Sequence, residues 1–117
     1  MAANSQIAFK PQGNTVVVAS TTSAPLGVQV LVNGRYSAAA TGQYRVINSG
    51  SVIVHLGVGA TAAEAQANAI APVAGTPSSA IVLLPGAVEV LRFAPEAFFS
   101  GLSSSASTVY ITQGQGL

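Results

Sequence analysis

The 117-residue chain contains no cysteine, no tryptophan and no aspartate. Without cysteine it forms neither disulfides nor thiolate metal sites, so its redox compartment cannot be read from the sequence. The longest apolar runs, such as 80–84, span only a few residues, far short of the roughly 18 that indicate a transmembrane helix. Residues 1–14 lack a basic segment followed by an apolar stretch, so we expect no secretory signal and synthesis in a cytoplasm.

Charge is also scarce. Asp, Glu, Lys and Arg make up only 6% of the residues, against about 25% in an average domain. The four basic residues are too scattered to form a phosphate-binding stripe, so we expect no nucleic-acid partner. A free monomer usually carries more surface charge, and a disordered chain has fewer apolar residues than the 50% found here. The composition therefore predicts a folded chain that a partner surface covers in large part.

Side chains that commonly serve as catalytic residues or metal ligands are few. His55 is the only histidine, and Glu64, Glu89 and Glu96 are the only carboxylate side chains. A Ser-His-acid triad or a zinc site needs an organised cluster of such groups. Glu89 or Glu96 is expected to form an ordinary ion pair with Arg45, in preference to a glycosidase pair. We therefore expect no enzymatic activity, metal, cofactor or small-molecule substrate, and we expect His55 on a strand that faces solvent or a neighbour.

A glycine motif follows the run that contains His55. Gly57-x-Gly59-x-x-Ala62 between a strand and a helical segment has the form of a dinucleotide-binding turn. That site needs parallel strands and an acidic residue about 20 positions on, but no acid follows Glu64 until Glu89. The glycines are therefore interpreted as the point where a sandwich strand ends and turns.

Short β-rich runs separated by glycine, proline and asparagine dominate the chain. This pattern is typical of a sandwich or barrel, so we predict an all-β fold, an antiparallel β-sandwich or jelly-roll-like domain. The predicted strands are 15–20, 27–32, 43–48, 51–56, 80–84, 87–93 and 108–112.

Three turns and one helix are predicted from the backbone preferences of particular residues. Asn48-Ser49-Gly50 fits a three-residue hairpin loop with Gly50 at positive φ. Pro85-Gly86 fits a type II turn that joins two strands as a hairpin. Asn33-Gly34 indicates a type I′ turn or a plain loop. Residues 61–71 favour a short helix with Thr61 as its cap, ended by Pro72, which covers a sheet edge or touches a neighbouring subunit.

Alternation along the strands predicts which residues enter the core. Val52, Val54 and Leu56 should face inward and Ile53 and His55 outward. Likewise, Val109 and Ile111 should face inward, with Thr108, Tyr110 and Thr112 outward. The strand at 87–93 is apolar on both faces, with Val88 and Val90 opposite Leu91 and Phe93. Such a strand is covered on both sides, by its own chain or by another subunit.

The two ends differ from the middle. Residues 1–14 show no period and are expected to form an extended N-terminal arm. Residues 15–112 form the predicted β-sandwich domain, and 113–117, with two closely spaced glycines, form a C-terminal tail.

Aromatic residues are the candidate partner contacts. Phe98 and Phe99 are adjacent and would point to opposite faces of a strand, so one anchors the core and the other meets a partner, or both are buried under a loop. Tyr44 is a further aromatic of this kind. The candidate partner or subunit contacts are Phe9, Lys10, Tyr36, Phe98, Phe99 and Tyr110.

Three segments together resemble a known family. TGQYRVINSGSVIVHLGVGATAAEAQANA, LLPGAVEVLRF and VYITQGQGL, within residues 41–117, are similar to small tailed-phage structural proteins that resemble capsid decoration, or cement, proteins. The most distinctive pieces are Asn48-x-Gly50, Leu84-Pro85-Gly86 and the closing segment from Tyr110. Relatives often carry proline and glutamate in that closing segment, where this chain has Gln113 and Gln115.

The resemblance implies a β-sandwich or jelly-roll fold and a non-enzymatic virion structural protein. Such a protein lies on the outer capsid surface and bridges subunits of the major capsid protein, commonly as a homodimer or homotrimer. No membrane partner is expected. The alternatives are a tail or head–tail junction component and a glycan- or receptor-binding β-sandwich module.

Overall fold

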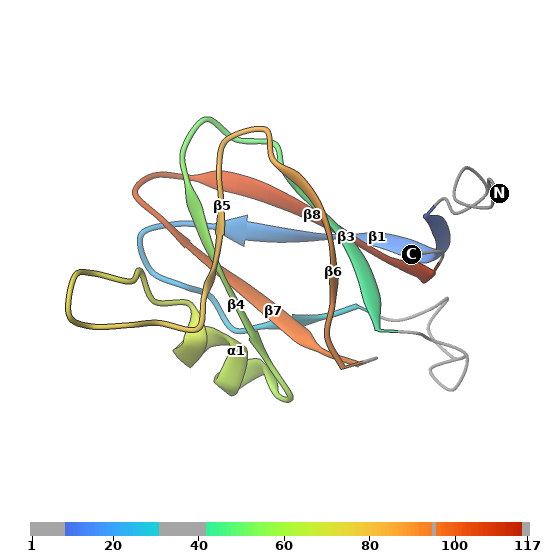
Figure 1. Ribbon diagram of the computed structural model, residues 1–117, viewed down its shortest axis with the longest axis horizontal. Helices are drawn as coiled ribbons and strands as arrows, with labels where there is room; N and C mark the ends of the chain where they lie inside the picture. Colours follow the sequence, from blue (N-terminus) through green and yellow to red (C-terminus); the bar gives the residue numbers. More distant parts are fainter. Residues whose placement is uncertain (1–8, 31–41, 95, 116–117) are drawn as a thin grey trace, which may run out of the picture.

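The described part of the chain forms two antiparallel four-stranded sheets and one short helix (Figure 1). The computed structural model describes residues 9–30, 42–94 and 96–115. The strand orders are β1-β8-β3-β6 in one sheet and β2-β7-β4-β5 in the other. The elements are β1 (Lys10–Ser20), β2 (Val28–Gln29), β3 (Gln43–Asn48), β4 (Val54–Gly59), α1 (Ala62–Asn68), β5 (Ile81–Leu83), β6 (Val88–Arg92), β7 (Phe98–Ser103) and β8 (Ser107–Gln115).

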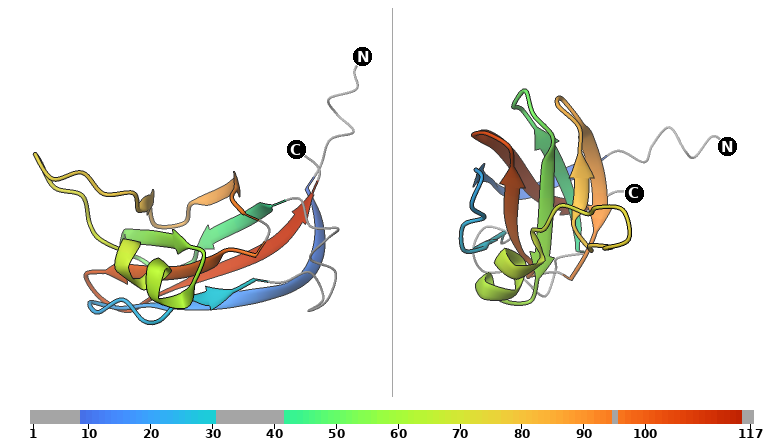
Figure 2. Two further views of the ribbon diagram at one scale, coloured as in Figure 1. Left: turned by 90° about the horizontal axis from the view of Figure 1, so that it is seen from below. Right: turned by 90° about the vertical axis from the view of Figure 1, so that its left-hand side faces the viewer.

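The strands pair in a nested series. β1 pairs with β8, β2 with β7, β3 with β6 and β4 with β5, every pair antiparallel. The chain is therefore one long two-stranded ribbon, and further pairing of β3 with β8 and of β4 with β7 wraps it into two sheets. This is the jelly-roll arrangement, and Figure 2 shows its two layers from the side. The predicted all-β sandwich fold is confirmed.

The core lies between the sheets and follows the predicted alternation. Val54, Leu56, Val109 and Ile111 are fully buried, whereas Ile53 is 41% exposed. An aromatic cluster of Tyr44, Phe93 and Phe99 fills one region, with the rings of Tyr44 and Phe99 edge-to-face and their centroids 5.0 Å apart. Edge-to-face packing adds to the stabilisation that these large side chains gain from burial.

The assignments of β4 and β7 differ from the prediction. β4 begins at Val54 rather than residue 51 and continues to Gly59, so the glycines lie inside the strand instead of ending it. β7, with the sequence FFSGLS, was not predicted because its serines and glycine have low strand propensity. It is a central strand with β2 on one side and β4 on the other, and this pairing outweighs propensity.

The Asn48-Ser49-Gly50 hairpin prediction was wrong. β3 and β4 belong to different sheets, and this segment crosses between them. The glycines with positive φ in the described residues are Gly42, Gly75 and Gly86, so Gly50 has no such requirement. A Cβ on Gly50 would overlap Ser107, and this close approach is the reason for glycine there.

The Pro85-Gly86 turn is confirmed, but its hairpin is not. Gly86 has φ of 78°, and the Ala87 N–H donates to the Leu84 carbonyl at 3.0 Å, as in a type II turn. β5 and β6, however, lie in different sheets, so this turn also crosses the sandwich. Sequence turns therefore predict a change of direction but not the sheet that receives the next strand.

The helix is shorter than predicted. α1 ends at Asn68, before Pro72, and Thr61 is its N-cap as expected, because the Thr61 hydroxyl accepts from the Glu64 N–H at 3.1 Å. The Glu64 carboxylate accepts from the Ala60 N–H at 2.8 Å, which satisfies a second donor at this end. No helix among the described segments has the length and apolar character needed to cross a membrane.

The strands extend further toward both ends than predicted. β1 begins at Lys10 and β8 continues to Gln115, so both run beyond the 15–112 domain limits. The reason is their mutual pairing, Lys10 with Gln115 and Pro11 with Gly114, with a register shift between Pro11 and Thr15. Residues 1–8 and 116–117, the Asn33-Gly34 turn and Tyr36 lie outside the described residues.

Candidate interaction surface

Helix α1 lies on the outer face of the β2-β7-β4-β5 sheet, over the central strands β4 and β7. Gly57 and Gly59 allow this contact. A Cβ on Gly57 would overlap the backbone of Ala65 and Ala69, and one on Gly59 would lie 2.6 Å from the Ala65 nitrogen. The predicted role of the helix at a sheet edge was therefore wrong, and the glycines serve close helix–sheet packing.

The rest of this outer face is apolar and surrounds the single histidine. His55 pairs with Val82 on β5 and with Leu102 on β7, and Ile53 and Leu84 continue the same outward alternation. Val82 is 46% exposed and Leu84 59%. We call Ile53, His55, Val82, Leu84 and Leu102 the His55 patch.

A shallow hollow adjoins this patch. Its volume is about 350 Å³, and mostly apolar atoms line it. The residues around it are Thr22, His55, Ala71, Leu102, Ser103 and Ser104. Within the part of the chain that the structure describes, no group of three or more His, Cys, Asp or Glu side chains is placed to hold a metal. His55 thus lies in apolar surroundings and not in a ligand cluster.

The outer face of the β1-β8-β3-β6 sheet carries a continuous apolar row. Val17 lies opposite Tyr110, Tyr110 opposite Ile47, and Ile47 opposite Val88, so the row crosses all four strands. Val17 is 51% exposed, Val88 61% and Tyr110 39%. We call Val17, Tyr110, Ile47 and Val88 the bare row, and the sheet surface that bears it the bare face.

The two ends of the bare face carry side chains of different size. Arg45, two residues from Ile47 on β3, has its guanidinium carbon 5.5 Å from the centroid of the Phe9 ring, within cation–π range. Thr112, beside Arg45, is only 4% exposed. At the other end stand the small residues Ala19 and Thr108, which are paired across β1 and β8. We call Arg45 and Phe9 the ridge, and the small residues Ala19 and Thr108 the step.

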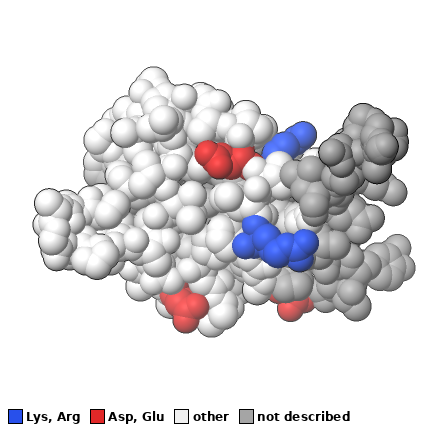
Figure 3. Space-filling view, viewed as in Figure 1, with Lys and Arg blue, Asp and Glu red and all other residues white. Residues whose placement is uncertain are grey.

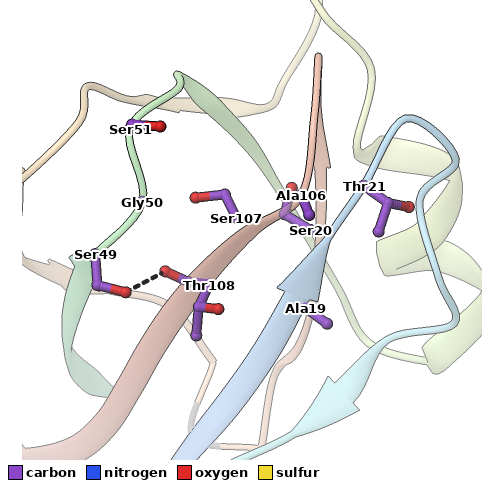
Figure 4. Close-up of a pocket in the computed structure, with 9 residues that line it drawn as sticks. All are labelled: Ala19, Ser20, Thr21, Ser49, Gly50, Ser51, Ala106, Ser107 and Thr108. Carbon is purple, nitrogen blue, oxygen red and sulfur yellow. Dashed lines mark hydrogen bonds between the residues drawn. The ribbon is translucent and has the colours of Figure 1, made fainter.

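A hydroxyl-lined hollow of about 600 Å³ opens at one end of the sandwich (Figure 4). Its walls are the end of β1, the crossing segment after β3 and the start of β8. The lining residues are Ala19, Ser20, Thr21, Ser49, Gly50, Ser51, Ala106, Ser107 and Thr108. The Ser49 hydroxyl donates to the Thr108 carbonyl at 3.1 Å, and Ser20 donates to Ser103, so protein atoms already occupy part of this hydrogen-bonding capacity. The lining contains neither an aromatic nor a charged side chain.

Asn48 ties the wall of this hollow to the opposite sheet. It is fully buried, and its Nδ2 donates to the carbonyls of Val52, Leu83 and Leu84 at 2.9–3.2 Å. Its Oδ1 accepts from the Gly50 N–H at 3.1 Å and from the Ser107 hydroxyl at 3.0 Å. One side chain thus holds both crossing turns and joins the two sheets.

Charged side chains are few on the surface. Figure 3 shows only a few charged side chains on the face in view, and the left-hand end of the molecule shows none. Between Arg45 and Glu89 the sequence has a single charged residue, Glu64. Four members of the His55 patch lie within this interval, and the fifth, Leu102 on β7, is apolar, so the patch contains no lysine, arginine or carboxylate.

The candidate contact residues have different positions. Tyr110 lies exposed in the bare row, and Phe9 is half-buried against Arg45. Phe98 and Phe99 point to opposite faces of β7 as expected, but Phe99 is fully buried, so it is not available to a partner. Phe98 is half-buried beside Gly27 on the face that carries α1. The side chain of Lys10 and all of Tyr36 lie outside the description.

Tyr44, for which the sequence left both a core position and a partner contact open, is a core residue. It is fully buried, its hydroxyl donates to the Ala94 carbonyl at 2.6 Å, and it accepts from the Ala97 N–H at 3.3 Å. Burial raises the pKa of this phenol above its ordinary value. The expected pairing of Arg45 with a glutamate is also replaced, because Val90 and Thr112 flank Arg45 in the sheet and Phe9 lies under its guanidinium.

Sequence reasoning missed the bare row and the His55 patch as surfaces. Each is formed by residues from three or four separate strands, which only the register brings together. The available signal was the doubly apolar strand 87–93, and Val88 on that strand is indeed exposed. No protein-family model, curated protein or solved structure matches the chain.

Proposed function

We propose that this chain is a non-enzymatic virion structural protein that decorates and cements a phage capsid shell by bridging subunits of the major capsid protein. One observation carries the proposal: two exposed apolar surfaces, the His55 patch and the bare row, lie on the two outer faces of one sandwich. A bridging protein needs at least two contact surfaces that face different ways, and exposed apolar patches mark such contacts.

The chemistry of the surfaces supports attachment rather than catalysis. His55 has no carboxylate beside it, because its strand neighbours are Val82 and Leu102. The hydroxyl-lined hollow offers polar groups but no aromatic platform of the kind that sugar-binding sites use. Association by apolar burial suits a protein that binds only the assembled lattice, since every bound copy then stabilises the assembled state.

In this proposal the His55 patch docks on the shell from the outside of the virion. Its apolar residues, Ile53, Val82 and Leu84, are between 41% and 59% exposed and would lose contact with water on docking. A charge placed among them would be buried without a partner and would oppose binding. Leu84→Lys should therefore release the protein from particles.

The test uses purified particles from the phage or prophage whose genome encodes the chain. Quantitative mass spectrometry should find hundreds of copies per particle, and a particle reconstruction should show the density on the outer shell surface. About six or twelve copies at one vertex would instead indicate a junction component and would contradict the proposal. Leu84→Lys should abolish retention on the shell, whereas Ala67→Lys, at an exposed position of α1, should be retained like the unaltered protein.

A further inference from the structure

We propose that the bare face binds a second copy of this chain, so that two β1-β8-β3-β6 sheets stack face to face about a two-fold axis. The axis runs across the strands, along the bare row. In this arrangement each residue of the row meets the same residue of the other copy, as in any contact on a two-fold axis. The inference concerns the isolated chain in solution and does not depend on a role at a capsid.

The shape of the face favours a sheet as its occupant. The row is four strands wide, and its central members, Tyr110 and Ile47, are flanked on the edge strands by Val17 and Val88. Sheets of sandwich proteins pack about 10 Å apart through such apolar layers, with their strands roughly aligned. A second copy supplies a surface of the same width and the same apolar character.

The ridge and the step select this axis. Arg45 and Phe9 form the ridge at one end of the face, and Ala19 and Thr108 form the step at the other. Rotation about an axis across the strands exchanges the two ends, so each ridge packs over the small residues of the other copy. Rotation about an axis along the strands would instead bring the two ridges, each with a cationic guanidinium, to the same end.

The area reaches the lower bound for a specific dimer. The four strands of the face contain 31 residues. At about 4.8 Å by 3.3 Å per residue the face measures roughly 500 Å² on each copy, so the pair buries on the order of 1,000 Å², the size at which specific interfaces begin. The opposite outer face is a poorer candidate for stacking, because α1 occupies its centre over β4 and β7.

Sedimentation equilibrium of the full chain should show a dimer. Val88→Lys and Val17→Lys each place a charge at one end of the bare row, directly opposite the same charge of the other copy. Both positions are more than half exposed in the single chain, so folding is preserved. Each should weaken dimerisation at least a hundredfold. Leu84→Lys, on the opposite face, should change the dissociation constant by less than about threefold. A monomer at the highest soluble concentration, a trimer, or equal weakening by all three changes would overturn the inference.

Crosslinking tests the axis, because the chain contains no cysteine of its own. Val17→Cys alone and Val88→Cys alone should each give a covalent dimer with a short bis-maleimide, since each residue meets its own copy. When the Val17→Cys and Val88→Cys proteins are mixed, no crosslink should join a Val17→Cys copy to a Val88→Cys copy. In the proposed dimer these two residues are three strand spacings apart, about 14 Å. A mixed dimer without the two self-linked dimers would place the axis along the strands and contradict the arrangement.

Discussion

The two outer faces of this sandwich are built from different residues, although both are faces of four-stranded sheets. Where α1 covers the β2-β7-β4-β5 sheet, β4 presents Gly57 and Gly59, and the helix backbone lies against the strand. On the bare face the outward positions hold Val17, Tyr110, Ile47 and Val88. Glycine marks a face that the chain's own backbone approaches, whereas large apolar side chains mark a face that an outside layer can cover.

The largest effect is expected at Asn48, which holds the two sheets together. Asn48→Asp replaces a donor to three carbonyls with an acceptor at a fully buried position. The free energy of unfolding should fall by about 4 kcal/mol. The loss should grow as the pH rises above about 4, where the new carboxyl ionises in the unfolded chain but resists ionisation in the core.

Urea unfolding followed by circular dichroism at several pH values measures this effect. Asn68→Asp is the matched control, because Asn68 makes a single such bond, to the Val58 carbonyl at 2.8 Å, from a half-buried position. It should cost about 1 kcal/mol. Equal losses for the two variants would show that the Asn48 network does not join the sheets.

The second prediction compares the faces directly. Gly57→Ala adds one carbon that would lie 2.8 Å from the Ala69 Cα and overlap other backbone atoms of α1, so the helix must move away. The free energy of unfolding should fall by about 3 kcal/mol. Ala19→Val adds two carbons to an exposed outward position on β1 and should change this free energy by less than about 0.5 kcal/mol at a protein concentration at which the chain is monomeric. Similar losses at both positions in thermal unfolding would remove the distinction between a packed and a bare face.

The third prediction concerns Tyr44, which lies in the core between the two sheets. Tyr44→Phe removes the hydrogen bonds to Ala94 and Ala97 and should cost about 1 kcal/mol at neutral pH. Because burial raises the folded-state pKa of Tyr44, its contribution is fully present below the unfolded pKa of about 10 and is lost as the pH rises through the folded pKa. The unaltered protein should therefore lose stability above pH 10 more steeply than Tyr44→Phe. Parallel alkaline unfolding curves for the two proteins would contradict this.

The smallest effect is expected from salt. If apolar faces carry association, few ion pairs are present for salt to screen, and the dimer dissociation constant should change by less than about threefold between 50 and 500 mM NaCl. Sedimentation equilibrium at several salt concentrations measures it. The same should hold for retention on shells, and release by moderate NaCl alone would argue for charged contacts at the His55 patch.

Local chemistry predicted much of the fold. The alternation of Val54 and Leu56, the Thr61 cap and the turn at Gly86 follow from neighbouring residues, and all three are confirmed. The hairpins at Gly50 and Pro85 were wrong because each segment crosses between sheets, and nested pairing of distant strands decides which sheet receives the next strand. β7 was missed for the same reason, since its partners lie far away in sequence.

The sequence predicted that the chain has a partner surface but not which residues form it. That prediction came from the low charge and from the strand 87–93, which is apolar on both faces. Tyr110 points outward as predicted, and its role as a partner contact stays a prediction. Alternation places Tyr44 on the inner side of β3, where Phe93 and Phe99 complete the core. Which outward residues form one surface depends on register, and register depends on contacts such as that of Thr15 with Thr112.

The nested pairing also sets an order of events during synthesis. β1 is made first, yet its partner β8 is the last strand, and the intervening ribbon cannot close until residues 107–115 have left the ribosome. Until then, Val16 and Val18 have no sheet to enter, and contacts this distant in sequence form slowly. A ribosome that pauses before residue 107 would hold a chain with exposed apolar strands, the state most prone to aggregate or to recruit a chaperone.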